Sequence, residues 1–330
     1  MIAATVVGLL FVAGLVTAFV LVAAPEPRIA EPKDVFGFAT PRQSQTAIEP
    51  PKLQRYPARD GEQLAYRFYD STAQRILIFI HGSSYHGGGY HALAAALSLG
   101  GAAKVVLPNL RGHYMSGQRR GDIDYIGQYE DDLDDLIKVL RSQGLTGPIT
   151  LGGHSSGGGL AIRFAGGAHA ADVSSYLILA PAIPRSPALR AGTAGGWAML
   201  NFKRLFGLIA LNMIGIHGYN GLPIIAFNKP PQYWDGTETL SYSYRLNASY
   251  HPRVNYDADI RALPSQTLVL VGANDESIDP DALRVLITTD VPAAQMKIMP
   301  GINHFGVFSE PAALNVAADW LRTLPDGGSR

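Results

Sequence analysis

Short apolar runs alternate with amphipathic segments along most of this 330-residue chain. A continuous run such as residues 75–80 (RILIFI) is typical of a strand that is buried on both faces of a parallel sheet. Strands are predicted at residues 63–69, 75–80, 104–107, 148–151, 175–179, 267–271 and 295–299. Apolar residues at helical spacing predict helices at residues 129–140, 158–165, 281–287 and 311–321. Strands alternating with helices predict an α/β fold with a mainly parallel central sheet flanked by helices.

One interval between predicted strands is too long for a single crossover. About 80 residues separate the strand that ends near Leu179 from the strand that begins near Leu268. Loops of this length rarely lack structure of their own, and this one is rich in apolar side chains such as Trp197 and Phe206. An insertion at about residues 184–260 is therefore predicted to form a helical cap over the sheet.

The first apolar run is longer than the others. Residues 2–24 carry no charge, and a helix of that length crosses roughly 30 Å of hydrocarbon. A secretory signal would have a basic residue before a shorter apolar run, and none precedes this one. Small residues at 22–24 could form a cleavage site, but Pro25 follows them directly. An N-terminal transmembrane anchor at residues 1–24 is the first interpretation, and a signal sequence that releases an exported protein and a buried core helix are the alternatives.

A proline-rich linker is predicted at residues 25–51. Its six prolines favour extended backbone, which would hold the following domain, residues 52–330, a short distance from the bilayer. The basic residues Arg28 and Lys33 lie after the apolar run and favour a cytoplasmic domain, but acidic residues lie among them. The sequence therefore leaves open which side of the membrane the domain faces.

Composition excludes several classes of function. Lys and Arg together number 27, as do Asp and Glu, so the formal net charge is zero and no basic patch indicates a nucleic-acid partner. The chain has no cysteine, which excludes disulfides, thiolate metal sites and a cysteine nucleophile.

The strongest chemical signal is the sequence GHSSG at residues 153–157, which matches G-x-S-x-G. A predicted strand leads into it and a predicted helix leads out, with small residues on both sides of Ser155. A turn this tight has no room for side chains at the glycine positions, and it exposes the serine hydroxyl at the carboxyl edge of the sheet. Ser155 is therefore the predicted nucleophile.

A nucleophilic serine needs a base, and the base needs an acid that orients it. His304 lies in the loop after the last predicted strand, and Asp275 follows the strand before it, so both are expected at the edge where Ser155 emerges. Asp279 is a rival acid, although its place before a predicted helix favours a capping role.

The oxyanion of a tetrahedral intermediate needs hydrogen-bond donors. We expect the backbone N–H of Ser156, which follows the nucleophile, and that of Ser83, in the loop after the strand RILIFI. His81, His86 and His91 recur on that loop, but they lack a nearby carboxylate and their spacing does not stack them on one helix face, so no metal site is predicted. The acidic run at residues 130–135 is interpreted as a solvent-exposed helix face rather than a cation site.

Together these segments resemble a known superfamily over residues 50–323. The matching segments are HGSSYHGGGY, PNLRGHYMSG, GHSSGG, VGANDESIDP and GINHF. The chain resembles the α/β-hydrolase superfamily, most of all the serine-hydrolase branch that contains monoacylglycerol lipases and lysophospholipases. The resemblance implies the α/β-hydrolase fold with a cap, Ser155, Asp275 and His304 as a catalytic triad, Ser83 and Ser156 as oxyanion donors, and no cofactor.

Hydrolysis of a carboxylic ester through an acyl-enzyme on Ser155 is the leading hypothesis for function. The apolar insertion and the membrane anchor favour a lipid-like ester, such as a monoacylglycerol or a lysophospholipid. Two alternatives remain open: an aminopeptidase or amidase of the same fold, and a catalytically inactive, membrane-anchored binding protein.

Overall fold

The central sheet has eight strands in a computed structural model that describes residues 2–29, 31–39, 48–190 and 196–325. In spatial order the strands are β1 (Gln54–Pro57), β2 (Gln63–Tyr69), β4 (Lys104–Asn109), β3 (Ile76–Ile80), β5 (Ile149–His154), β6 (Ser175–Leu179), β10 (Thr267–Gly272) and β11 (Gln295–Met299). Strand β2 runs antiparallel to both its neighbours, and all other pairs are parallel. The predicted mainly parallel sheet is confirmed, and the four-residue β1 was missed because it is too short to show a pattern.

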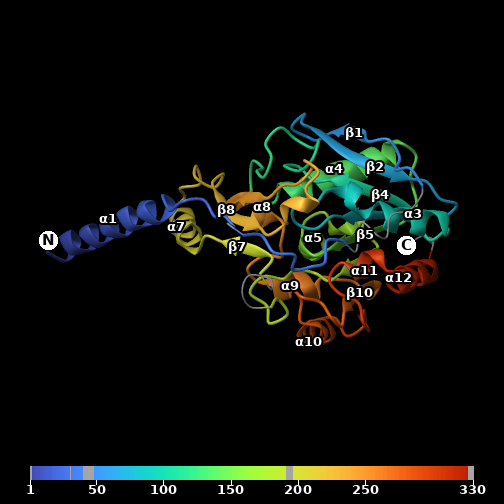
Figure 1. Cartoon of the computed structure of the whole chain (residues 1–330). Coiled ribbons are helices and arrows are strands. Elements are labelled where there is room, and N and C mark those ends of the chain that lie inside the picture. The colour runs from blue at the N-terminus through green and yellow to red at the C-terminus, as the bar shows by residue number, and fades with distance from the viewer. Residues whose placement is uncertain (1, 30, 40–47, 191–195, 326–330) are drawn as a thin grey trace.

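Helices cover the sheet on its two faces (Figure 1). They are α3 (His91–Leu99), α4 (Gln128–Ser142), α5 (Ser156–Ala165), α9 (Tyr256–Arg261), α10 (Pro280–Asp290), α11 (Gly306–Ser309) and α12 (Pro311–Thr323). Helices α3, α11 and α12 contact one another, while α5, α9 and α10 form a second contacting series. All five residues of β3 and all six of β5 are buried, as expected for strands covered on both faces.

The insertion between β6 and β10 forms a mixed cap rather than the helical one predicted. It contains a three-stranded antiparallel sheet of β7 (Ala198–Leu200), β8 (Pro223–Phe227) and β9 (Ser241–Ser243), together with helices α7 (Phe202–Met213) and α8 (Tyr244–Ser249). Strands β7 and β9 have three residues each, too few for an alternation that a sequence pattern could reveal, and the apolar run of the longer β8 does not distinguish it from the helical part of the insertion.

The N-terminal helix α1 (Ile2–Val22) projects from the rounded body and packs against α7 of the cap (Figure 1). A side chain at Gly207 would lie 2.7 Å from Ala18 O, so this glycine allows the two helices to approach closely. Arg204 donates to Val22 O at 3.1 Å and to Ala24 O, and its positive charge meets the negative end of the helix dipole.

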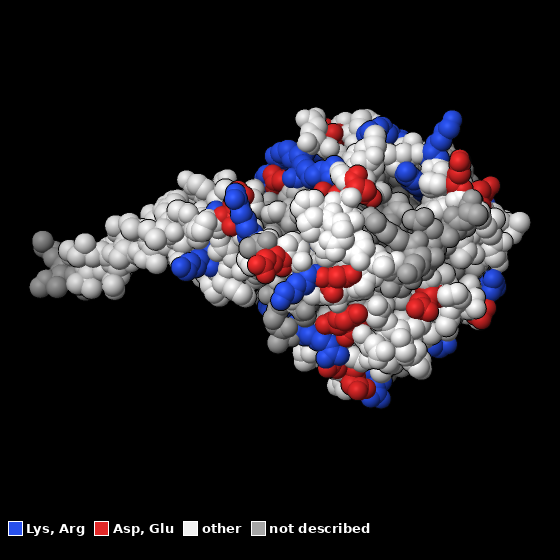
Figure 2. Space-filling view, in the orientation of Figure 1, with Lys and Arg blue, Asp and Glu red and all other residues white. Residues whose placement is uncertain are grey.

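The projecting part of α1 is free of charged side chains (Figure 2). Within the described residues, α1 is the one helix long and apolar enough to cross a membrane, a property that signal sequences share.

The first part of the predicted linker is not a free spacer. Residues 35–38 belong to no helix or strand, yet Phe36 and Phe38 are buried among side chains of the α/β domain and the cap. Residues 40–47 of the predicted linker lie outside the described residues.

The acidic run at residues 130–135 differs from its sequence interpretation. Glu130, Asp132 and Asp134 are buried, not solvent-exposed. Glu130 accepts from Arg163 at 2.5 Å, and Asp132 accepts from Arg111 at 2.8 Å. The exposed-face interpretation was wrong because these basic partners come from distant segments that the local pattern does not reveal.

Candidate active site

Ser155 lies in a sharp turn between β5 and α5. Its backbone has φ 55° and ψ −121°, a conformation that non-glycine residues rarely adopt. A side chain at Gly153 would come within 2.3 Å of Gly157 O, and one at Gly157 within 2.4 Å of His81 O. The two glycines of the motif are therefore required by close backbone approach, as the sequence pattern predicted for a nucleophile turn.

Asp275 and His304 form a buried hydrogen-bonded pair. His304 Nδ1 lies 2.8 Å from Asp275 Oδ2 and 3.0 Å from Oδ1, and both residues are almost fully shielded from solvent. Asp275 Oδ1 also accepts from the backbone amides of Ser277, at 2.8 Å, and Ile278, at 2.7 Å. These bonds fix the carboxylate, which in turn holds a proton on Nδ1 and leaves the other imidazole nitrogen free to accept one.

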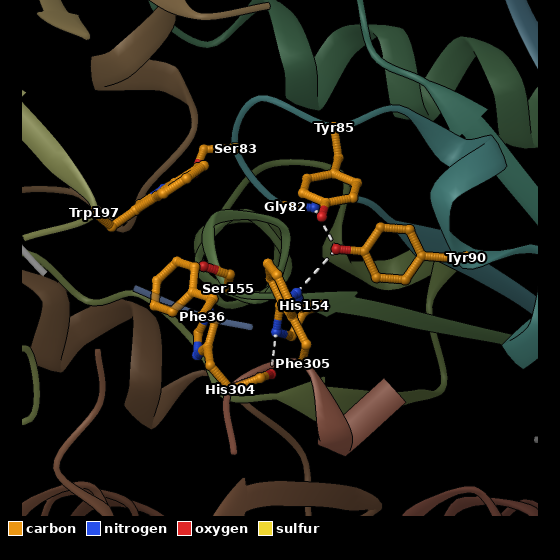
Figure 3. Close-up of a pocket in the computed structure, with 10 residues that line it drawn as sticks. All are labelled: Phe36, Gly82, Ser83, Tyr85, Tyr90, His154, Ser155, Trp197, His304 and Phe305. Carbon is orange, nitrogen blue, oxygen red and sulfur yellow. Dashed lines mark hydrogen bonds between the residues drawn. The ribbon is translucent and has the colours of Figure 1, made fainter. Parts of the chain in front are cut away.

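Ser155 and His304 line one small cavity (Figure 3). The other lining residues are Phe36, Gly82, Ser83, Tyr85, Tyr90, His154, Trp197 and Phe305. The hydrogen bonds of the described residues do not include one between the Ser155 hydroxyl and His304. Such bonds are often long before substrate binds and tighten when the reacting complex forms.

The two predicted oxyanion donors come from the loop after β3 and from the start of α5. Ser83 lines the cavity, and Ser156 is the first residue of α5 but does not line it. Neither backbone amide donates to another described residue. The Ser83 hydroxyl accepts from Trp197 Nε1 at 3.0 Å, which ties the loop after β3 to the cap.

A hydrogen-bond chain that sequence reasoning missed connects the three loops of the site. The Gly82 amide donates to Tyr90 Oη, which lies 2.9 Å from His154 Nδ1, and His154 Nε2 lies 2.9 Å from the His304 carbonyl (Figure 3). Because a carbonyl only accepts, His154 donates from Nε2 and accepts from Tyr90 at Nδ1. Burial, with a smaller contribution from His304, holds the pKa of His154 well below its ordinary value, so this neutral form persists.

Asp279, the rival acid, caps a helix instead. Its side chain accepts from Ala282 N at 2.9 Å at the start of α10, the role that its position favoured.

The loop histidines have protein partners on their ring nitrogens. His81 Nε2 accepts from Leu110 N at 3.1 Å, and His91 lies within hydrogen-bond distance of Tyr69 Oη and Ile48 O. Among the described residues, no cluster of three or more His, Asp or Glu side chains is placed to hold a metal ion.

Comparison with known proteins places this geometry in a family. Residues 77–318 match the sequence profile of the Alpha/beta hydrolase family, which covers most of the chain and every residue of the site except Phe36. The chain belongs to the Alpha/beta hydrolase family. This α/β hydrolase also resembles monoacylglycerol lipases: it is 26% identical to the monoacylglycerol lipase of Mycolicibacterium smegmatis over 79% of this chain and 93% of that one.

Solved structures share the α/β-hydrolase fold. The monoglyceride lipase of Saccharomyces cerevisiae, solved as a soluble variant with a substrate analogue, superposes with a TM-score of 0.64 at 20% identity, covering 84% of this chain and 96% of that one. The monoacylglycerol lipase of Paleococcus ferrophilus gives a TM-score of 0.55 at 20% identity, with 78% and 98% covered.

Proposed function

We propose that this α/β hydrolase cleaves a carboxylic ester through an acyl-enzyme on Ser155. The observation that carries the proposal is the Asp275–His304 pair at 2.8 Å, with His304 on the same cavity as Ser155. A serine hydroxyl is a weak nucleophile alone, and a neighbouring oriented imidazole is the group that activates it.

The proposed reaction has two similar halves. His304 takes the proton of Ser155 as its oxygen attacks the ester carbonyl, and Asp275 stabilises the imidazolium that forms. The amides of Ser83 and Ser156 donate to the oxyanion, each contributing about 3 kcal/mol to the stability of the transition state. His304 then protonates the leaving alcohol, and water, activated by the same imidazole, releases the acid.

A lipid-like ester, such as a monoacylglycerol or a lysophospholipid, is the proposed substrate. Aromatic side chains of Tyr85, Trp197 and Phe305 line the cavity, so the surroundings of Ser155 favour an apolar acyl group. The relative in Mycolicibacterium smegmatis, which matches most of this chain, is a monoacylglycerol lipase by name.

We further propose that α1 is an uncleaved membrane anchor, followed by a linker and one α/β domain with its cap. Ala18 and Val22 are buried, and Arg204 binds carbonyls of Val22 and Ala24. These contacts involve the residues that signal cleavage would separate from the domain. Helix α7 also exposes Phe202, Phe206 and Met213 beside α1, an apolar face suited to a lipid surface.

A substrate panel tests the proposed function. We expect purified full-length protein to hydrolyse p-nitrophenyl esters and monoacylglycerols, with kcat/KM rising from acetyl to decanoyl chains. Ser155→Ala should abolish the activity while leaving the unfolding temperature close to that of the native protein. Preference for acetyl esters would contradict the lipid substrate, and full activity of Ser155→Ala would contradict the mechanism.

A further inference from the structure

A short N-terminal segment, residues 35–38, lies inside the candidate active site. The Phe36 ring lines the same cavity as Ser155 and stacks on the His304 imidazole, with ring centroids 4.6 Å apart and an angle of 26° between the planes (Figure 3). Only 2% of Phe36 and 3% of Phe38 is exposed to solvent. The segment therefore covers the proposed base, although it precedes the whole α/β domain in sequence.

Phe38 fills an aromatic chamber beside this cavity. We define the chamber by Tyr85, Trp197, Tyr233 and Phe305, whose ring centroids lie 5.1 to 6.4 Å from that of Phe38. Trp197 and Tyr233 belong to the cap, Tyr85 to the loop after β3, and Phe305 to the loop that carries His304. The chamber is thus built from the elements that surround Ser155, and its walls are aromatic.

The space left in the cavity is too small for a substrate. It measures about 10 Å³, enough for about one water molecule, whereas sites that hold organic ligands measure roughly 300–1,000 Å³. An ester with an apolar acyl chain therefore cannot reach Ser155 while Phe36 and Phe38 keep these positions.

Among the described residues, few polar contacts hold the segment in place. Lys33 N donates to Asn228 Oδ1 of the cap at 2.6 Å, and Asn303 Nδ2 donates to Phe36 O at 3.4 Å. The bond from Phe38 N to Asp34 Oδ1, at 3.0 Å, stays within the N-terminal stretch. The attachment is chiefly apolar packing, and an apolar ligand can replace packing of that kind.

We propose that the aromatic chamber is the acyl-binding site and that residues 35–38 are an internal competitor for it. Phe36 and Phe38 stand in for the acyl chain of an ester, and the substrate displaces them when it binds. This inference rests on the proposed function and adds to it the place where the acyl chain lies. A long apolar chain restores the contacts that the two rings lose, whereas an acetyl group does not, so the site selects long-chain esters.

Removal of both rings tests the competition. We call the form with residues 35–38 in the chamber the closed form. If it is the main form of the free protein, only the remaining open fraction binds substrate, and the apparent affinity falls to that fraction of its intrinsic value. Phe36→Ala/Phe38→Ala should then lower KM for p-nitrophenyl decanoate about tenfold and speed labelling by a fluorophosphonate probe by a similar factor. The matched control is Leu99→Ala/Val285→Ala, which removes two apolar side chains that are exposed on α3 and α10, away from the chamber and from the proposed lipid-facing side. Its KM should stay within about twofold of the native value.

A reversible lock provides a second test that keeps both rings in place. Because the chain has no cysteine, Lys33→Cys/Asn228→Cys introduces a single possible disulfide that ties the segment to the cap. Fluorophosphonate labelling should be about tenfold slower in the oxidised protein than in the reduced protein, since the lock holds the closed population.

The outcomes separate this inference from the proposed function. Equal labelling rates in the native protein, the double alanine variant and the oxidised lock would overturn the internal competitor alone. Absence of labelling in all of them, with the reduced lock included, would overturn the proposed function as well.

Discussion

At the scale of single residues, the environment of each acidic side chain determines its role. Asp275 and Asp279 are four positions apart, yet one meets an imidazole and the other meets the start of a helix. The difference arises because Asp275 lies in the turn just after β10, where its carboxylate accepts two backbone amides and faces the loop of His304.

A matched pair of amide substitutions separates these two roles. Asp275→Asn should lower kcat about 10⁴-fold, because an amide favours the wrong imidazole tautomer and cannot stabilise the imidazolium. Asp279→Asn should leave kcat within about twofold, since asparagine caps helices as well as aspartate does. Steady-state kinetics of both variants with p-nitrophenyl butyrate provides the measurement. A larger loss of kcat in Asp279→Asn than in Asp275→Asn would show that Asp279, and not Asp275, orients His304.

The residues of the proposed triad could be picked out from the sequence because each lies next to a recognisable strand end. Ser155 follows β5, Asp275 follows β10 and His304 follows β11. The hydrogen bonds of His154 could not be predicted, since its partners, Tyr90 and the His304 carbonyl, come from other parts of the chain. Phe36 and Phe38 were missed for a related reason: two aromatic residues in a proline-rich stretch are too few to show a period that indicates burial.

At the scale of elements, continuous apolar runs made the strands of the sheet predictable, because burial on both faces leaves no polar positions. Helix α3 was missed because its sequence HALAAALSL has no polar face and follows three glycines. The pairing of α1 with α7 was also unpredictable, since both partners are apolar and far apart in sequence.

A substitution at the crossing point tests that pairing. Gly207→Leu should separate the helices, because a side chain there would lie 2.7 Å from Ala18 O and 2.9 Å from Leu21 Cβ. Overpacking of this kind costs about 1–3 kcal/mol. The control Gly8→Leu adds the same side chain to α1 at a position with open space. In detergent micelles, trypsin should cleave after Arg28 faster in Gly207→Leu than in the control. Equal cleavage rates would show that α1 does not depend on this contact.

At the scale of the whole molecule, buried neutral histidines link stability to pH. Burial is the largest cause that lowers the pKa of His81, His113 and His154, in the case of His113 to about 3. In the unfolded chain these residues take up protons near their ordinary pKa of about 6.5. Unfolding therefore binds protons at acidic pH, and stability is full above about pH 6.5 and is lost as the pH falls.

Urea denaturation at pH 7, 6 and 5 measures this linkage. Once these histidines are mostly protonated in the unfolded chain, each should lower the free energy of unfolding by about 1.4 kcal/mol for every unit by which the pH falls. A constant free energy of unfolding between pH 7 and pH 5 would contradict the neutral state of these side chains.

The central claim is that His304, oriented by Asp275, activates the hydroxyl of Ser155. Intact-mass measurement after incubation with a fluorophosphonate tests it most directly, because this probe reacts with activated serines. We predict one adduct per chain, mapped by peptide analysis to Ser155, absent in Ser155→Ala and formed far more slowly in His304→Ala. An adduct on another residue, or an unchanged rate in folded His304→Ala, would contradict the account.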